Sequence, residues 1–228
     1  MNWKGIPYEA IDVNPLTKAE ISFSPSYRKV PIGMLLLFTS SYSRLLVLFN
    51  DRQLNDSSVI MDELIESLRV SGKLPANFKG SSDPEIARWL QFADKQLAVV
   101  LFPNITRNML ESWEAFGYIN RVSHFGYFQK IILRVTGSVA MRLANSKIKK
   151  KYSIIDERES LLLAVNEWTT NGLNGKKFHG YSEPDLADVT IFGCLKSIES
   201  FATFAWLVNV APKEFMIWFN RMGQVVVF

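Results

Sequence analysis

The feature that most constrains this chain is a helical spacing of apolar residues from Asp83 onward. Asp83, Pro84 and Glu85 are a helix-capping residue, a proline suited to the first helical position and an acid for the first turn. Apolar residues then recur at helical spacing until Pro103 and Asn104, where we expect the helix to end. The same spacing predicts further helices over 105–116, 127–144, 157–169 and 188–204. The second part of the chain is therefore expected to be all-helical.

The first 79 residues have a different pattern, in which short strand-like segments alternate with short helices. We expect a strand over 8–13, a hairpin formed by MLLLF (34–38) and LLVLF (45–49) around the polar segment TSSYSR, and a helix over 59–68. The Gly80-Ser81-Ser82 tripeptide is the predicted linker. The sequence thus predicts an α+β protein with domains over 1–79 and 80–228.

Composition limits the function classes that the chain can serve. The 228 residues include 48% hydrophobic residues, enough for a substantial core, and a formal charge of +4, too small to indicate nucleic-acid binding. The single cysteine, Cys194, excludes an internal disulfide, a CxxC redox pair and a thiolate metal site, and its apolar helical setting predicts an inert residue. No targeting peptide is visible, and Arg44 makes the apolar stretch 33–50 a poor membrane span, so a soluble, cytoplasmic-side chain is expected.

Several polar and aromatic residues carry both a structural and a functional interpretation. His124 and His179 lie in loop-like contexts without acids at metal-ligand spacing, so structural or solvated roles are expected and no metal site is predicted. Lys147-Ile-Lys-Lys-Lys151 is predicted to be the solvated end of a helix, with contact to an anionic membrane as the alternative. The aromatic residues of 118–128 are expected in the core, with a substrate pocket as the alternative: Tyr118, Phe125, Tyr127 and Phe128.

Two local motifs suggest a binding site, and a third suggests a structural cap. Pro31 precedes the apolar run of the hairpin, where a proline is confined to edges or first residues, and one fold class uses such a proline to hold a ligand. Asp56, Ser57 and Ser58 open a helix, either as a simple cap or as a site for an anion. Asp185, with Asp188 three residues later, approximates a capping box.

These motifs resemble the glutathione transferase superfamily and, more narrowly, the membrane-associated type 2 prostaglandin E synthase family. The specific matches are RKVPI (28–32), LNDSSVI (54–60) and Leu186-Ala-Asp188 with Gly193, and a weaker match covers most of the helical part. The resemblance implies an N-terminal thioredoxin-like (glutaredoxin-like) α/β domain that lacks its first strand. An all-helical domain like the C-terminal domain of glutathione transferases follows it.

The resemblance also implies a ligand and a reaction. A cis Val30–Pro31 bond would let the Val30 backbone pair with the cysteinyl part of glutathione, and Asp56 and Ser57 would hold its γ-glutamyl end. The family isomerises prostaglandin H2 to prostaglandin E2, an apolar substrate, with glutathione and sometimes haem bound, on Golgi or mitochondrial membranes, and such proteins are often homodimers. The reactive CxxC segment is absent, so catalytic residues stay unknown. The alternative is a non-catalytic glutathione-binding or interaction module.

Overall fold

The structure of the chain is a computed structural model. It describes residues 13, 18–23, 32–37, 47–55, 57–74, 78–121 and 126–226. The chain divides into two units, Met1–Asp83 with Gln224–Phe228, and Pro84–Gly223, which are called unit 1 and unit 2 below. The predicted domain boundary between residues 79 and 80 stays a prediction.

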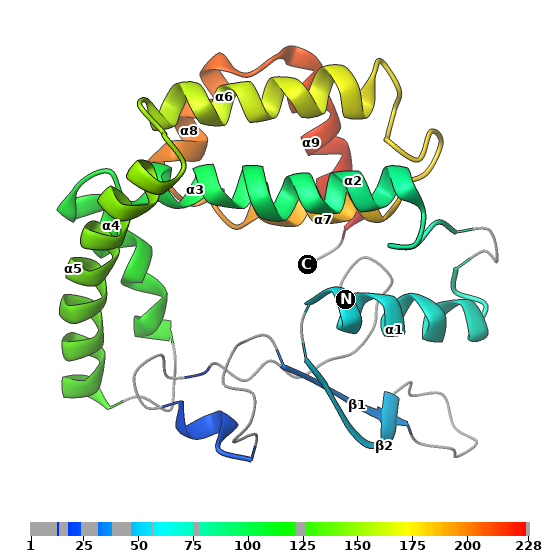
Figure 1. Cartoon of the computed structure of the whole chain (residues 1–228), viewed down its shortest axis with the longest axis horizontal. Coiled ribbons are helices and arrows are strands. Elements are labelled where there is room, and N and C mark those ends of the chain that lie inside the picture. Colours follow the sequence, from blue (N-terminus) through cyan, green and yellow to red (C-terminus); the bar gives the residue numbers. More distant parts are fainter. Residues whose placement is uncertain are drawn as a thin grey trace. The chain divides into compact units, whose positions relative to one another are not determined.

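Unit 1 contains a β-hairpin followed by a helix (Figure 1). Strands β1 (Ile32–Leu37) and β2 (Val47–Asn55) pair antiparallel, with an irregular register between Met34 and Leu36. A short 3-10 helix, η2 (Ala19–Ile21), precedes them. The predicted hairpin is therefore present, although β2 extends further than the LLVLF segment. The predicted strand over 8–13 lies outside the described residues, except for Val13, which is not in a strand.

Helix α1 (Ser57–Val70) presents an apolar face to the interior of unit 1. Ile60, Leu64 and Leu68 are buried at helical spacing, and Leu54 of β2 is buried as well. Polar contacts fix the far end of the helix, because the guanidinium of Arg69 donates to the carbonyl of Phe78 at 2.5 Å. The helical spacing of Ile60, Leu64 and Leu68 gives the segment an apolar face, and packing of this face in unit 1 stabilises the helix.

The elements described in unit 2 are all helices, as the apolar spacing predicted, apart from an isolated β-bridge between Phe178 and Tyr181. A long first stretch combines α2 (Pro84–Phe92), the π-helical η3 (Ala93–Leu97) and α3 (Ala98–Ile105). The remaining elements are α4 (Met109–Ala115), η4 (Phe116–Arg121), α5 (Tyr127–Lys151), α6 (Glu157–Glu167), η5 (Trp168–Leu173), α7 (Leu186–Lys196), α8 (Ala202–Val210) and α9 (Lys213–Val225).

Aromatic side chains form the core of unit 2. Trp168 lies between Trp89 and Trp218, with ring centroids 5.1 and 5.3 Å away in edge-to-face arrangements. Phe192 of α7 and Phe219 of α9 extend this cluster, with centroids 4.9 Å apart. Because each buried aromatic ring removes a large apolar area from water, this cluster stabilises the helical unit.

Helix α5 lies at the edge of unit 2 and runs at a steep angle to α3 and α6 (Figure 1). Only Leu133, Ser138 and Asn145 of its 25 residues are buried. Asn145 ties the helix to the end of α3, since its amide donates to the carbonyls of Pro103 at 3.0 Å and Thr106 at 2.9 Å. The helix is thus held along one side and leaves the other side uncovered by described residues.

The helix continues one residue beyond its predicted end at Pro103 and Asn104. Pro103 lies inside α3, which continues to Ile105. The proline removes one backbone hydrogen bond, but only two residues of helix follow it, and the side chain of Asn104 donates to the carbonyl of Val100 at 2.9 Å. A helix that already extends over many residues therefore tolerates the proline in its last turn.

Two other predicted boundaries are also corrected. The single helix predicted over 188–204 is two helices, α7 and α8, because Ser197 donates its hydroxyl to the carbonyl of Cys194 at 2.6 Å and tight turns follow. The helix predicted over 105–116 is shorter, since Asn108 caps α4 by accepting from the Glu111 amide at 2.8 Å. Helix α9 was not among the predicted elements.

The predicted core position of the aromatic stretch is wrong for two of its residues. Tyr127 and Phe128 open α5 and are exposed, with 74% and 79% of their surface accessible. The side chain of Tyr118 and all of Phe125 lie outside the described residues. The first turn of α5 precedes Leu133, the first buried residue of the helix, and no described residue covers these two rings.

Candidate functional site

The residues predicted to bind glutathione fall largely outside the description. Val30, Pro31 and Asp56 are not among the described residues. Ser57 is described as the first residue of α1, but its side chain is not. The predicted roles of these four residues therefore stay predictions, and the described neighbours carry the structural information.

The strand register brings the two predicted segments to one end of the hairpin. Ile32, which follows Pro31 in the sequence, pairs with Asn55, which precedes Asp56. Helix α1 begins at Ser57, two residues after this pair. One end of the hairpin thus combines the entry into β1, the exit from β2 and the start of a helix.

The start of α1 is suited electrostatically to an anion. Its first turn contains no acidic residue, and Ser57 and Ser58 are residue types that occur at helix starts. The first N–H groups of any helix lack partners within the helix, and the helix dipole places positive potential there. A carboxylate or phosphate is the ligand that such a geometry binds.

The start of α7 is the opposite case, a helix start whose donors are already satisfied. The Asp185 carboxylate accepts from the amides of Ala187 at 2.9 Å and Asp188 at 3.1 Å, and Asp188 accepts from the Asp185 amide at 3.1 Å. This reciprocal pair confirms the predicted capping box. Its role is structural, because the side chains of the helix itself occupy the positions that an anion would take.

Asp188 also accepts three hydrogen bonds from two other segments, the loop at 179–180 and α9. Its fully buried carboxylate accepts from the amides of His179 at 3.0 Å and Gly180 at 3.2 Å. The indole Nε1 of Trp218 in α9 donates to it at 2.8 Å. Sequence spacing predicted the bond to Asp185 but not these three, because their donors come from a loop and a distant helix.

Burial and neighbouring charges shift the pKa values of this cluster. Burial, with the charge of Asp185, raises the pKa of Asp188 to about 6. For His179, burial lowers the pKa, but the hydrogen bond to Asp185 and the nearby charges outweigh burial, so the pKa is raised. The ring Nδ1 lies 2.5 Å from Asp185 and Nε2 lies 3.3 Å from Glu85. His179 is therefore a buried structural residue, one of the two roles expected for it, while His124 lies outside the described residues.

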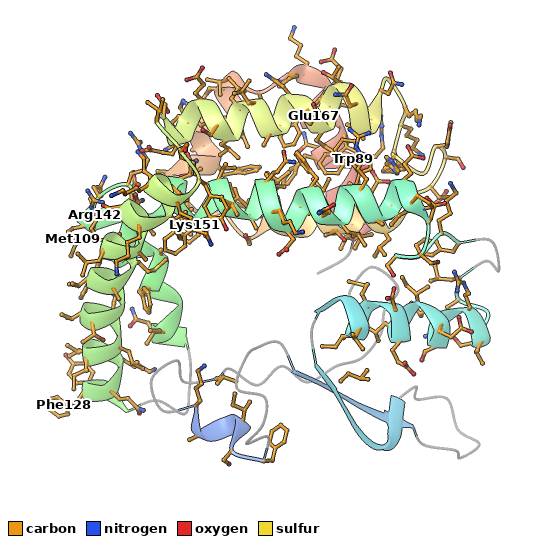
Figure 2. The ribbon with its side chains drawn as sticks, in the orientation of Figure 1. Trp89, Met109, Phe128, Arg142, Lys151 and Glu167 are labelled. Carbon is orange, nitrogen blue, oxygen red and sulfur yellow. The ribbon has the colours of Figure 1, made fainter. Side chains whose placement is uncertain are left out.

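A shallow pocket of about 290 Å³ lies in unit 2 beside α2. Arg88, Trp89, Lys95 and Glu167 are among its lining residues, and Figure 2 shows Trp89 between α2 and α6. Arg88 crosses to Glu167 with an N–O distance of 3.4 Å. The sequence analysis did not predict this pocket; its lining residues lie within 88–96, except for Glu167, which α6 brings to the same place.

The lone cysteine does not provide a reactive thiolate. Cys194 lies in α7, and burial, together with the charge of Asp94, raises the pKa of its thiol. In the part of the chain that the structure describes, no group of three or more His, Cys, Asp or Glu residues is placed to hold a metal ion. No described helix combines the length and the apolar character that crossing a membrane requires.

The described structure defines a mostly helical protein in which a β-hairpin and one helix precede a helical unit. Over nearly its whole length the chain is similar to prostaglandin E synthase 2. It is 29% identical to the protein from Danio rerio over 264 aligned positions, which cover 98% of this chain and 66% of that protein. It is 27% identical to the protein from Mus musculus, covering 99% of this chain and 65% of that protein. These comparisons support the predicted relationship, and no family model matches the chain.

Proposed function

We propose that the chain binds glutathione at the end of the hairpin and isomerises prostaglandin H2 to prostaglandin E2. The similarity to prostaglandin E synthase 2 from two vertebrates supports the reaction. The pairing of Ile32 with Asn55, directly before the start of α1, is the structural observation that supports the site. The proposal includes the fold of a glutathione transferase, with a thioredoxin-like first domain followed by a helical domain.

The backbone pairing at the end of the hairpin supports a site for a tripeptide with an anionic end. Chain connectivity puts Pro31 next to Ile32 and Asp56 next to Asn55, so a paired strand end joins the two predicted contact segments. The Val30 backbone would then pair with the cysteinyl part of the ligand, as an added strand does. Asp56 would face the amino group of the γ-glutamyl residue of glutathione. The first turn of α1 would stabilise the carboxylate of the same γ-glutamyl residue.

The proposed reaction opens an endoperoxide without net oxidation or reduction. Glutathione, when bound, would supply a reactive thiol, a role to which Cys194 is not suited because burial raises the pKa of its thiol. The chain would contribute binding, orientation of the tripeptide and the positive potential at the start of α1.

Haem stays a prediction of the resemblance. His179 does not fit as an axial ligand, because both of its ring nitrogens face carboxylates. Homodimer formation and attachment to an organelle membrane also stay predictions.

A second function, a glutathione-binding module without catalysis, is favoured by one observation. Cys194 is the only cysteine of the chain, and its thiol is held in the protonated form. The chain spans 66% and 65% of the lengths of the relatives described above, so their activity is carried over only as a proposal. Glutathione binding without prostaglandin H2 turnover would identify this second function.

Calorimetric titration of the whole chain with glutathione tests the binding site. We expect the parent to bind glutathione. The double variant Asp56→Ala/Ser57→Ala should lose at least about tenfold in affinity, because each substitution removes a charge-assisted contact to the ligand. Ser71→Ala is the matched control, since Ser71 follows the other end of α1, where its hydroxyl donates to the carbonyl of Leu68.

Absence of glutathione binding by a folded parent would contradict both functions. Equal affinity in the parent and the double variant would contradict the assigned residues. A prostaglandin H2 turnover assay with and without glutathione then separates the enzyme from the module.

A further inference from the structure

Helix α5 carries a stripe of apolar side chains that no described residue covers. Its members recur at intervals of four, three, four and four residues, so they lie on one face of the helix. Between 44% and 79% of each side chain is exposed. The stripe consists of Phe128, Ile132, Val135, Val139 and Leu143.

The charge of the same helix is entirely positive. None of the 25 residues of α5 is acidic. The basic residues of the helix are Lys130, Arg134, Arg142, Lys147, Lys149, Lys150 and Lys151. A folded helix with both an exposed apolar stripe and an unbalanced positive charge differs from an ordinary surface helix, which mixes both signs of charge.

The basic residues near the end of α5 are placed around the stripe. At helical spacing, Arg142 and Lys147 flank its last member, and Lys150 continues its line. Figure 2 shows Phe128 at one end of the helix and Lys151 at the other. Lys149 is engaged with Glu157, but Lys147 and Lys150 form no ion pair with any described residue.

We propose that this face of α5 docks on an anionic lipid bilayer. The apolar stripe enters the boundary between head groups and acyl chains, and the lysines at the end of the helix contact lipid phosphates and carboxylates. Exposed aromatic and branched apolar residues next to lysine and arginine are the composition that binds such an interface. This docking does not depend on glutathione binding or on the proposed reaction.

Charge complementarity favours a bilayer over a second copy of the chain. Two α5 helices that paired through their stripes would bring together two positively charged surfaces, and α5 has no acidic residue to compensate. Nucleic acid would satisfy the charge but would leave Phe128, Val135 and Leu143 without an apolar partner. A bilayer with anionic head groups satisfies both the charge and the apolar side chains.

Vesicle flotation with the whole chain tests the proposal. We expect the parent to float with vesicles of an equal mixture of phosphatidylcholine and phosphatidylserine, and to bind about tenfold less to phosphatidylcholine alone. Val135→Ser/Val139→Ser and, separately, Lys147→Glu/Lys150→Glu are each expected to reduce binding about tenfold. Leu163→Ser/Ile217→Ser is the matched control, because both are exposed apolar residues on other helices, and it should bind as the parent does.

The expected stability of these variants keeps the test decisive. All the substituted side chains are exposed or half-buried, so circular dichroism and thermal unfolding should match the parent closely. Absence of vesicle binding by the parent, equal binding to neutral vesicles, or unchanged binding in both α5 variants would overturn the proposal. A dimer in light scattering that the serine variant converts to a monomer, without vesicle binding, would instead identify a second copy as the occupant.

Discussion

Helices α7 and α5 belong to the same unit but differ in how their sequences are used. Six of the eleven residues of α7 are buried, and its first turn is closed by Asp185 and Asp188. Only three of the 25 residues of α5 are buried, and its first turn carries two exposed aromatic side chains, Tyr127 and Phe128. Helix α7 stabilises the unit, whereas α5 presents an exposed surface.

The comparison shows that burial and hydrogen bonding, rather than apolar content, separate the two roles. Both helices are rich in apolar residues. Those of α7 are mostly buried, and the helix also contains the buried carboxylate of Asp188, which accepts four hydrogen bonds. In α5 the apolar residues of the stripe have no described partner. Substitutions should therefore affect folding at α7 and surface binding at α5.

The largest effect is expected at Asp188. Asp188→Ala removes the acceptor of the His179, Gly180, Asp185 and Trp218 donors and leaves them buried. We expect the free energy of unfolding to fall by about 4 kcal/mol, as measured by urea denaturation. Asp94→Ala is the control at an exposed position, with an expected change below about 0.5 kcal/mol. Similar losses in the two variants would show that α7 does not depend on this carboxylate.

The next effect is a pH dependence that originates from the same carboxylate. Its pKa is about 6 in the folded chain, against the ordinary 3.8, so between these values the folded state holds the extra proton. The free energy of unfolding therefore falls as the pH rises from about 4 to about 6, by up to about 3 kcal/mol. Denaturation of the parent and of Asp188→Asn over this range measures it. A parent whose dependence is no steeper than that of the variant would contradict the shift.

A smaller effect is expected where α5 is attached. Asn145→Ala leaves the carbonyls of Pro103 and Thr106 without their buried donor. We expect a loss of about 2 kcal/mol in the free energy of unfolding. Asn209→Ala in α8 is the matched control, since that exposed amide donates only to the carbonyl of Ala205 within its own helix. If the two asparagine variants are equally stable, the attachment of α5 does not depend on the Asn145 amide.

Sequence predicted those parts of the fold that depend on residues close together in the chain. The capping box was predictable because Asp185 and Asp188 are three residues apart, and the start of α2 because Pro84 follows a capping residue type. Helix α9 was missed although Phe215, Trp218, Phe219 and Met222 recur at helical spacing, a signal that could have identified it.

Features that depend on distant residues could not be predicted. His179 is buried beside Trp89 and Trp168, which belong to helices distant in the sequence. Its imidazole ring stacks on Trp168 with the ring centroids 5.8 Å apart. Phe128 is exposed because no described residue covers it, and the local sequence does not indicate whether a distant residue will do so. Of the candidate site, the sequence predicted the segments, and the pairing of Ile32 with Asn55 supplies their proximity.

The uneven attachment of α5 has a consequence for local opening of the backbone. Of its buried residues, Leu133 lies in the N-terminal half, Ser138 lies next to the midpoint and Asn145 lies in the C-terminal half. Amide hydrogens near Tyr127 are therefore released by fraying of the first turns, while those near Asn145 exchange only when the end of α3 also separates. The turn that precedes the packing of Leu133 against Ile119 is therefore expected to open before the rest of the helix, and without disturbing the bonds of Asn145.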